Sequence, residues 1–181
     1  MTAALLALAV AASPGGALVV DPAASVVKFH LEHKLHKVDG RSSSVEGKAV
    51  VGDDGRVMTM IRIPVATFDT GDANRDSHMR ETLDAGKFPH VVFKGVTSVT
   101  VPVAHGKPLE TRLQGELEFH GVKRAVELPV EVSFQPDGGA VVKARFAVSL
   151  DAHKIERPSL LFIKVDDQLL MDVELTLKPA G

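Results

Sequence analysis

A two-residue alternation of apolar and polar side chains constrains the fold of this chain more than any other feature of its sequence. Successive side chains of a β-strand point to opposite faces, so the alternation predicts strands with one apolar and one polar face. In residues 113–119, for example, Leu113, Leu117 and Phe119 share one face, and glutamine and glutamate occupy the other. The pattern appears eight times, in residues 27–31, 45–51, 57–65, 91–101, 113–119, 126–134, 142–150 and 171–177.

Turn sequences separate these stretches and favour hairpins, because Gly, Pro and Asp suit tight β-turns between antiparallel strands. They include residues 52–55 (GDDG) and 136–139 (PDGG). Two stretches break the alternation. Residues 74–85 predict a short helix with Met79 and Leu83 on one face, and residues 157–163 predict a short helix or a lid segment that begins at its proline.

Eight strands with one apolar face each must bury those faces together, between two packed sheets or inside a closed barrel. Closure also removes exposed strand edges, so we predict an all-β fold: an eight-stranded antiparallel barrel with a helical insertion near residues 74–85. The inward positions mix four phenylalanines with Gly47, Ala49, Gly115 and Ala144, which can leave room for a hydrocarbon guest. Periodicity alone leaves a filled sandwich without a ligand, acting as an interaction module, as an alternative.

Composition narrows the class of protein further. The chain has 181 residues and 45% hydrophobic content, which suits one globular domain. Its formal charge of −2 shows no basic excess of the kind that nucleic-acid binding requires. It has no cysteine, which removes disulfides, thiolate metal sites and cysteine nucleophiles. It also has no Trp and no Tyr, so a cavity would offer few groups that grip a polar molecule.

The N-terminal stretch is typical of a secretory signal peptide. Its uncharged Ala, Leu and Val run is too short to span a bilayer, and small residues lie before a plausible cut after Ala17. We therefore predict a signal peptide at residues 1–17 and one mature domain at residues 18–181, without a transmembrane segment.

Sequence motifs for catalysis and metal binding are weak. His30, His33 and His36 suggest a metal site, but His30 and His33 would face opposite sides of a strand, so we predict none. Ser25 and Lys28 have the spacing of an acyl-enzyme pair, which requires a helix and is here placed on a strand. We expect no catalytic residue and no cofactor; an enzyme acting on an apolar substrate is the less favoured alternative.

Three blocks of the sequence resemble the YceI-like family, and together they span about residues 20–177. The first is Asp21-Pro22 with Ser25, Phe29 and His33. The second is FDTG at 68–71, NRDSHM at 74–79 and KFPHVVF at 87–93. The third is LQGEL at 113–117 with FHGV at 119–122 and LPV at 128–130. This resemblance implies an extended lipocalin-like barrel, exported to the periplasm or outside the cell, that binds polyisoprenoids or other long apolar amphiphiles without catalysis.

The inward faces and the resemblance together give a set of candidate contacts. At the barrel mouth, Arg75 and His78 are candidates for binding a phosphate or another polar head, although a purely structural role at the helix start fits as well. The sequence leaves monomer and homodimer open. Ten side chains are expected to contact lipid: Phe29, Leu31, Ile61, Ile63, Phe93, Leu117, Phe119, Val130, Phe146 and Val148.

Overall fold

The computed structural model describes residues 16–33, 36–97, 108–160 and 163–180. These residues are mostly strands, with one α-helix and three short 3-10 turns. The strands are β1 (Ala17–Val20), β2 (Val26–His33), β3 (His36–Ser42), β4 (Glu46–Val51), β5 (Val57–Pro64), β6 (His90–Thr97), β7 (Leu109–Phe119), β8 (Val122–Phe134), β9 (Ala140–Ser149), β10 (Ser159–Leu160), β11 (Ile163–Lys164) and β12 (Gln168–Pro179). The helix is α1 (Ala73–Thr82), and the 3-10 turns are η1 (Pro22–Ala24), η2 (Val65–Thr67) and η3 (Asp151–His153).

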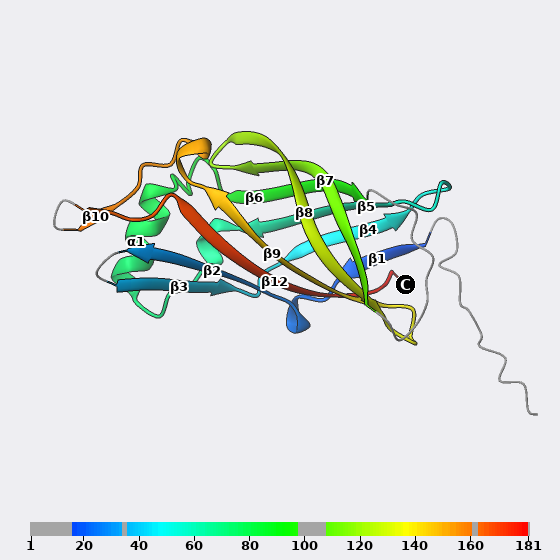
Figure 1. Cartoon of the computed structure of the whole chain (residues 1–181). Helices are drawn as coiled ribbons and strands as arrows, with labels where there is room; N and C mark the ends of the chain where they lie inside the picture. The colour runs from blue at the N-terminus through cyan, green and yellow to red at the C-terminus, as the bar shows by residue number, and fades with distance from the viewer. Residues whose placement is uncertain (1–15, 34–35, 98–107, 161–162, 181) are drawn as a thin grey trace, which may run out of the picture.

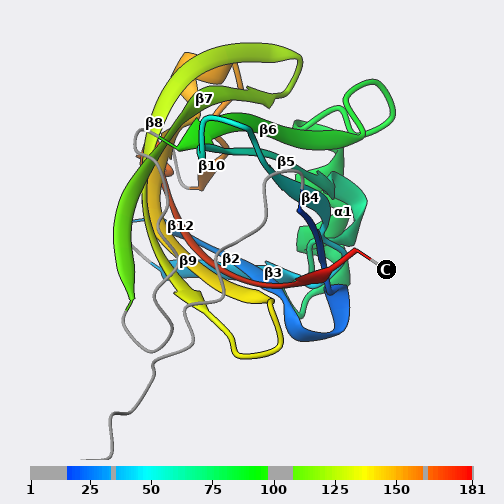
Figure 2. The same cartoon turned by 90° about the vertical axis from the view of Figure 1, so that its right-hand side faces the viewer.

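The main sheet closes on itself, as the view along its axis shows (Figure 2). It runs in the order β1-β4-β5-β6-β7-β8-β9-β12-β2-β3, and β12 also pairs with β1. Because β2 lies beside the first half of β12 and β1 beside its end, β1 and β2 act as one interrupted strand. In the same way, β3 pairs with β2 and β4 pairs with β1, so β3 and β4 also act as one interrupted strand. Ten strands thus occupy eight positions, which confirms the predicted closed antiparallel barrel and excludes two separate packed sheets.

Both interruptions fall at residues whose side chains bond the local backbone. Between β1 and β2, Asp21 caps η1 by accepting a hydrogen bond from the backbone N–H of Ala23, and Pro22 starts the turn. Between β3 and β4, the Ser42 hydroxyl accepts a bond from the backbone N–H of Ser44. Side-chain hydrogen bonds of this kind compete with the backbone hydrogen bonds of the sheet, so the strand is interrupted at these residues and begins again after them.

The strand β3 was not predicted from the alternation, because its inward positions are small or polar. These positions are Val38, Gly40 and Ser42, of which only valine is clearly apolar. Gly40 lies directly opposite Phe29 of β2, and a Cβ there would overlap the phenyl ring. The aromatic neighbour therefore excludes the side chain that would have completed the pattern.

The segment after η3 differs from the sequence-based expectation. A short helix or lid was predicted at residues 157–163, but β10 and β11 pair as an antiparallel hairpin, so the helix is wrong. The backbone N–H of Val165 donates to the carbonyl of Pro158 at 3.0 Å, which holds the base of this hairpin together. Proline lacks an N–H but keeps its acceptor, so it can end such a pairing.

The helix α1 occupies most of the predicted range of residues 74–85. It starts at Asp72, whose side chain accepts a bond from the backbone N–H of Arg75, as an N-cap should. It ends at Thr82, before the predicted end at residue 85, and Asp84 has a backbone in the left-handed region. Figure 1 shows α1 beside one end of the barrel, with β10 at the same end.

Two predictions concern residues that are largely outside the described part. The signal peptide at residues 1–17 falls mainly in residues 1–15, and the end of the fourth predicted strand falls in residues 98–101. Ala17 itself begins β1, and its carbonyl accepts a bond from the backbone N–H of Ala180. The cleavage site and the boundary at residue 18 stay predictions. Within the described ranges, no helix has both the length and the apolar character to cross a membrane.

Candidate functional site

The barrel encloses a cavity of about 620 Å³. Its wall consists of inward side chains from the barrel strands, completed by residues of α1, η2 and the segment before β10. Only five of the described lining residues are polar: Thr70, Arg75, His78, Thr82 and Ser159. The other described lining residues are aliphatic, Phe, Met or Pro, so a molecule inside the cavity would be surrounded mainly by apolar side chains.

Phenylalanine rings lie along the wall rather than across the lumen, because glycines make room for them. Phe29 covers Gly40 on the neighbouring strand. Phe93 folds back over Gly95 of its own strand, with its Cζ atom 2.5 Å from where a Cβ would be. A side chain at either glycine would push the ring inward. These two contacts therefore help to keep the barrel hollow.

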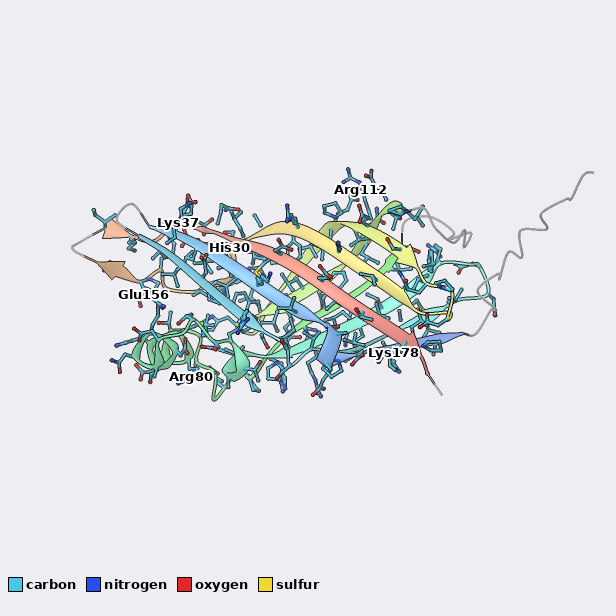
Figure 3. The ribbon with its side chains drawn as sticks, turned by 90° about the horizontal axis from the view of Figure 1, so that it is seen from below. His30, Lys37, Arg80, Arg112, Glu156 and Lys178 are labelled. Carbon is cyan, nitrogen blue, oxygen red and sulfur yellow. The ribbon has the colours of Figure 1, made fainter. Side chains whose placement is uncertain are left out.

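The mouth of the cavity is at the end that carries α1 and β10. Among the lining residues, Arg75, His78, Pro158 and Ser159 are exposed, whereas Phe93, Leu117 and Phe119 are buried. Figure 3 shows the same end from below, with Arg80 on α1 and Glu156 near β10 and β11, and Lys178 toward the opposite end. A guest would thus meet polar groups at one end and hydrocarbon along the rest.

Arg75 is held in place at this mouth by the loop before α1. Its Nε donates to the Thr70 hydroxyl and its Nη2 to the Thr70 carbonyl, both at 2.9 Å. The Thr70 hydroxyl in turn donates to Oδ1 of Asp76 at 2.5 Å, and the Thr70 backbone N–H donates to the same oxygen at 3.0 Å. Asp76 is 8% exposed, so this chain of bonds is anchored in the interior.

Two carboxyl groups near the mouth, those of Asp72 and Asp167, have a lowered pKa. The backbone N–H of Arg75 lowers the pKa of the Asp72 carboxyl. On the opposite side, the backbone N–H of Asp151 lowers the pKa of the Asp167 carboxyl, since a hydrogen bond to the charged form stabilises it. Both groups therefore carry a negative charge near neutral pH.

All ten side chains predicted to contact lipid line this cavity, and so do Arg75 and His78. The prediction missed lining residues in turns, such as Phe68, Ile155 and Val165, because the two-residue alternation applies only within strands. Phe68 packs edge-on against Phe29 at 5.7 Å between ring centroids, and its only sequence signal was its place in the FDTG block.

The weaker candidates have structural partners. His30 contacts Asp39 across the β2–β3 pair, with 2.7 Å between Nδ1 and Oδ1. His33 and His36 are paired in register, and their side chains lie outside the described part. The described residues contain no group of three side chains that could hold a metal ion. Ser25 is buried and bonds the backbone of Thr176, which gives it a structural role.

The interaction-module alternative would require an exposed apolar patch, and the exposed side chains of Met58, Met60 and Leu170 do not gather into one. Met58 and Leu170 are 54% and 45% exposed, and Met60 is also exposed. The two methionines lie on β5, but Leu170 lies on β12, with β4 and β1 between these strands.

Comparisons with known proteins agree with this architecture. The family model of the YceI-like domain matches residues 18–177. A polyisoprenoid-binding domain from Saccharophagus degradans, implicated in plant cell wall breakdown, is 16% identical, with a TM-score of 0.75 over 90% of this chain and 98% of that one. Burkholderia cenocepacia BcnA is 19% identical, with a TM-score of 0.71 over 87% and 98%.

A third solved structure, the YCEI protein of Campylobacter jejuni, is 15% identical, with a TM-score of 0.61 over 83% of this chain and 89% of that one. At these identities the three structures establish a shared fold. The curated proteins give no match.

Proposed function

This chain belongs to the YceI-like domain family, and on that ground we propose that it binds a polyisoprenoid or a similar long-chain amphiphile inside its barrel. The protein would be exported to the periplasm or secreted, and would transport, store or sequester its lipid without catalysis. The printed description of one relative as a polyisoprenoid-binding domain supports the ligand class.

The observation that carries the proposal is the composition of the cavity. It has about 620 Å³ and, apart from five polar side chains, an apolar lining throughout the described residues. Burying hydrocarbon is worth about 0.8 kcal/mol per methylene, before the cost of ordering the chain. A long tail therefore supplies a strong gross driving force, and selectivity among tails of similar length would be low.

The polar side chains support a fixed orientation of the guest. Arg75 and His78 line the exposed end of the cavity, where a polar head could stay in contact with water. The tail would then point toward Val130 and Leu175, which lie on the inward faces of β8 and β12.

The direct test is native mass spectrometry of the mature protein purified from its own host, followed by organic extraction of bound species. We expect a stoichiometric isoprenoid or long-chain amphiphile. An empty protein that also takes up no added polyprenyl lipid would refute the proposal. N-terminal sequencing of the same sample tests the predicted cut after Ala17.

A further inference from the structure

The charge at the cavity mouth restricts which head group the protein can accept. Arg75 is the one permanently cationic side chain among the described residues that line the cavity. A single cation does not balance the charge of a phosphate or diphosphate head, and a charge that leaves water without a full partner is costly.

The positive charge of Arg75 lies near the negative charge of Asp76, to which Thr70 connects it. Its Nε bonds the Thr70 hydroxyl, and that hydroxyl bonds the buried carboxylate of Asp76. The Arg75–Thr70–Asp76 unit is therefore close to neutral as a whole. Within the described residues, Nη1 of Arg75 has no hydrogen-bond partner, so it can still donate to an oxygen of a guest.

The surroundings of this unit are acidic. Residues 69–87, which contain α1 and its flanking loops, hold five carboxylates and three cations, a formal charge of −2. Residues 151–168, on the side of β10 and β11, hold four carboxylates and three cations, a formal charge of −1. Both segments thus carry a net negative charge, which disfavours an anion at the mouth.

Two of the nearby cations, Arg157 and Lys87, are engaged elsewhere. Nε of Arg157 bonds Asp151, and its Nη1 bonds the carbonyl of Val165, both at 3.0 Å. The Lys87 amine lies over the Phe88 ring, 5.0 Å from its centroid. These cations are therefore poorly placed to neutralise a phosphate next to Arg75.

From this geometry we propose that the mouth selects an uncharged head group that offers an oxygen acceptor to Arg75, such as an alcohol or a carbonyl, and rejects a phosphate. This rests on the proposed function, because it assumes that a lipid tail occupies the barrel. The sequence-based expectation allowed a phosphate or any other polar head group, whereas this proposal allows only uncharged head groups with an oxygen acceptor.

The test compares two ligands with the same tail, a polyprenol and its polyprenyl monophosphate, on the full delipidated chain. Displacement of one fluorescent lipid probe gives both affinities. We expect the alcohol to bind at least about tenfold more tightly, and the difference to shrink in high salt, because the repulsion is screened. A phosphate that binds as tightly as the alcohol, or more tightly, overturns the inference. If neither ligand binds, the proposed function itself fails.

A charge reversal at an exposed site gives an internal control. Glu81 lies on α1 with its carboxylate 3.9 Å from Nδ1 of His78, a lining residue. Glu81→Lys should raise the affinity for the monophosphate several-fold and leave that for the alcohol unchanged, with Glu81→Gln intermediate. Arg75→Gln should weaken the alcohol by about three- to tenfold, since it removes a donor. An unchanged ratio of the two affinities in Glu81→Lys would contradict the electrostatic basis.

Discussion

The phenyl ring of Phe29 occupies the space that a side chain at Gly40 would need, directly across the β2–β3 pair. Phe29 is buried and lines the cavity, so the ring forms part of the wall. The need for glycine at residue 40 is therefore linked to the volume of the cavity. A methyl group at residue 40 would project inward and could be accommodated only if the ring moved toward the lumen.

Gly40→Ala should therefore lower stability by about 1–3 kcal/mol and reduce the amount of lipid retained, because overpacking displaces the ring. Urea unfolding and lipid extraction measure the two effects. Gly86→Ala is the matched control, since nothing lies within 4 Å of its Cβ position. Phe29→Leu combined with Gly40→Ala should recover part of the loss. Unchanged stability and lipid content in Gly40→Ala would contradict this account of the wall.

Placing a carboxylate inside the cavity should abolish lipid retention. Leu117→Glu and Phe146→Glu each put a charged carboxylate among apolar side chains. A lipid tail would have to remove water from this carboxylate, which costs free energy. Ala147→Glu is the control, because Ala147 is exposed on the neighbouring position of the same strand. Ala144→Phe fills the cavity without a charge and should also reduce binding. Native mass spectrometry reports bound lipid; normal lipid content in folded Phe146→Glu would refute this placement.

The carboxylate of Asp76 should contribute to stability through Thr70. Asp76→Ala leaves the hydroxyl and the backbone N–H of Thr70 without their acceptor, which should cost about 1–3 kcal/mol. Lipid binding should weaken as well, since Arg75 depends on the same threonine. Ser77→Ala on the same helix removes only a 3.4 Å contact to Glu81 and should be nearly neutral. Equal unfolding midpoints for the two variants would show that Asp76 has no such role.

Protonation of the Asp167 carboxylate should contribute to the loss of stability at low pH. The backbone N–H of Asp151 lowers the pKa of this carboxyl below its ordinary 3.8. A lowered pKa means that the contribution is complete above about 3.8 and is lost as the pH falls through the pKa of the folded state. Melting temperatures of the native chain and Asp167→Asn should therefore differ most near neutral pH and converge in acid. A difference that is independent of pH would exclude this carboxyl as a source of the acid sensitivity.

Much of the candidate site could be predicted because alternation is a local property. A strand sends side chains to alternate faces whatever it pairs with, so Leu117 and Phe146 could be assigned to the interior without knowing their neighbours. The helix was found for a similar reason, since Met79 and Leu83 follow the spacing of a single helical face.

The prediction failed where the outcome depends on contacts between distant segments. The segment that forms the hairpin of β10 and β11 was predicted as a short helix or a lid segment, because Pro158 signals a break but does not determine how the chain continues. The lining residues Phe68 and Ile155 lie in turns and reach the cavity only because the barrel closes around them.

The sequence by itself therefore determined which side chains of the predicted strands face inward, the eight strand positions of the barrel and the apolar character of the interior, because these follow from periodicity and composition. The tertiary structure alone decided that the interior is hollow and how the polar side chains at its mouth are held. Hollowness depends on Phe29 lying over Gly40 and Phe93 over Gly95, and the mouth depends on Thr70 joining Arg75 to Asp76. Side-chain packing, closure of the sheet and the path of the loop before α1 set these contacts, and none of the three can be read from a local pattern.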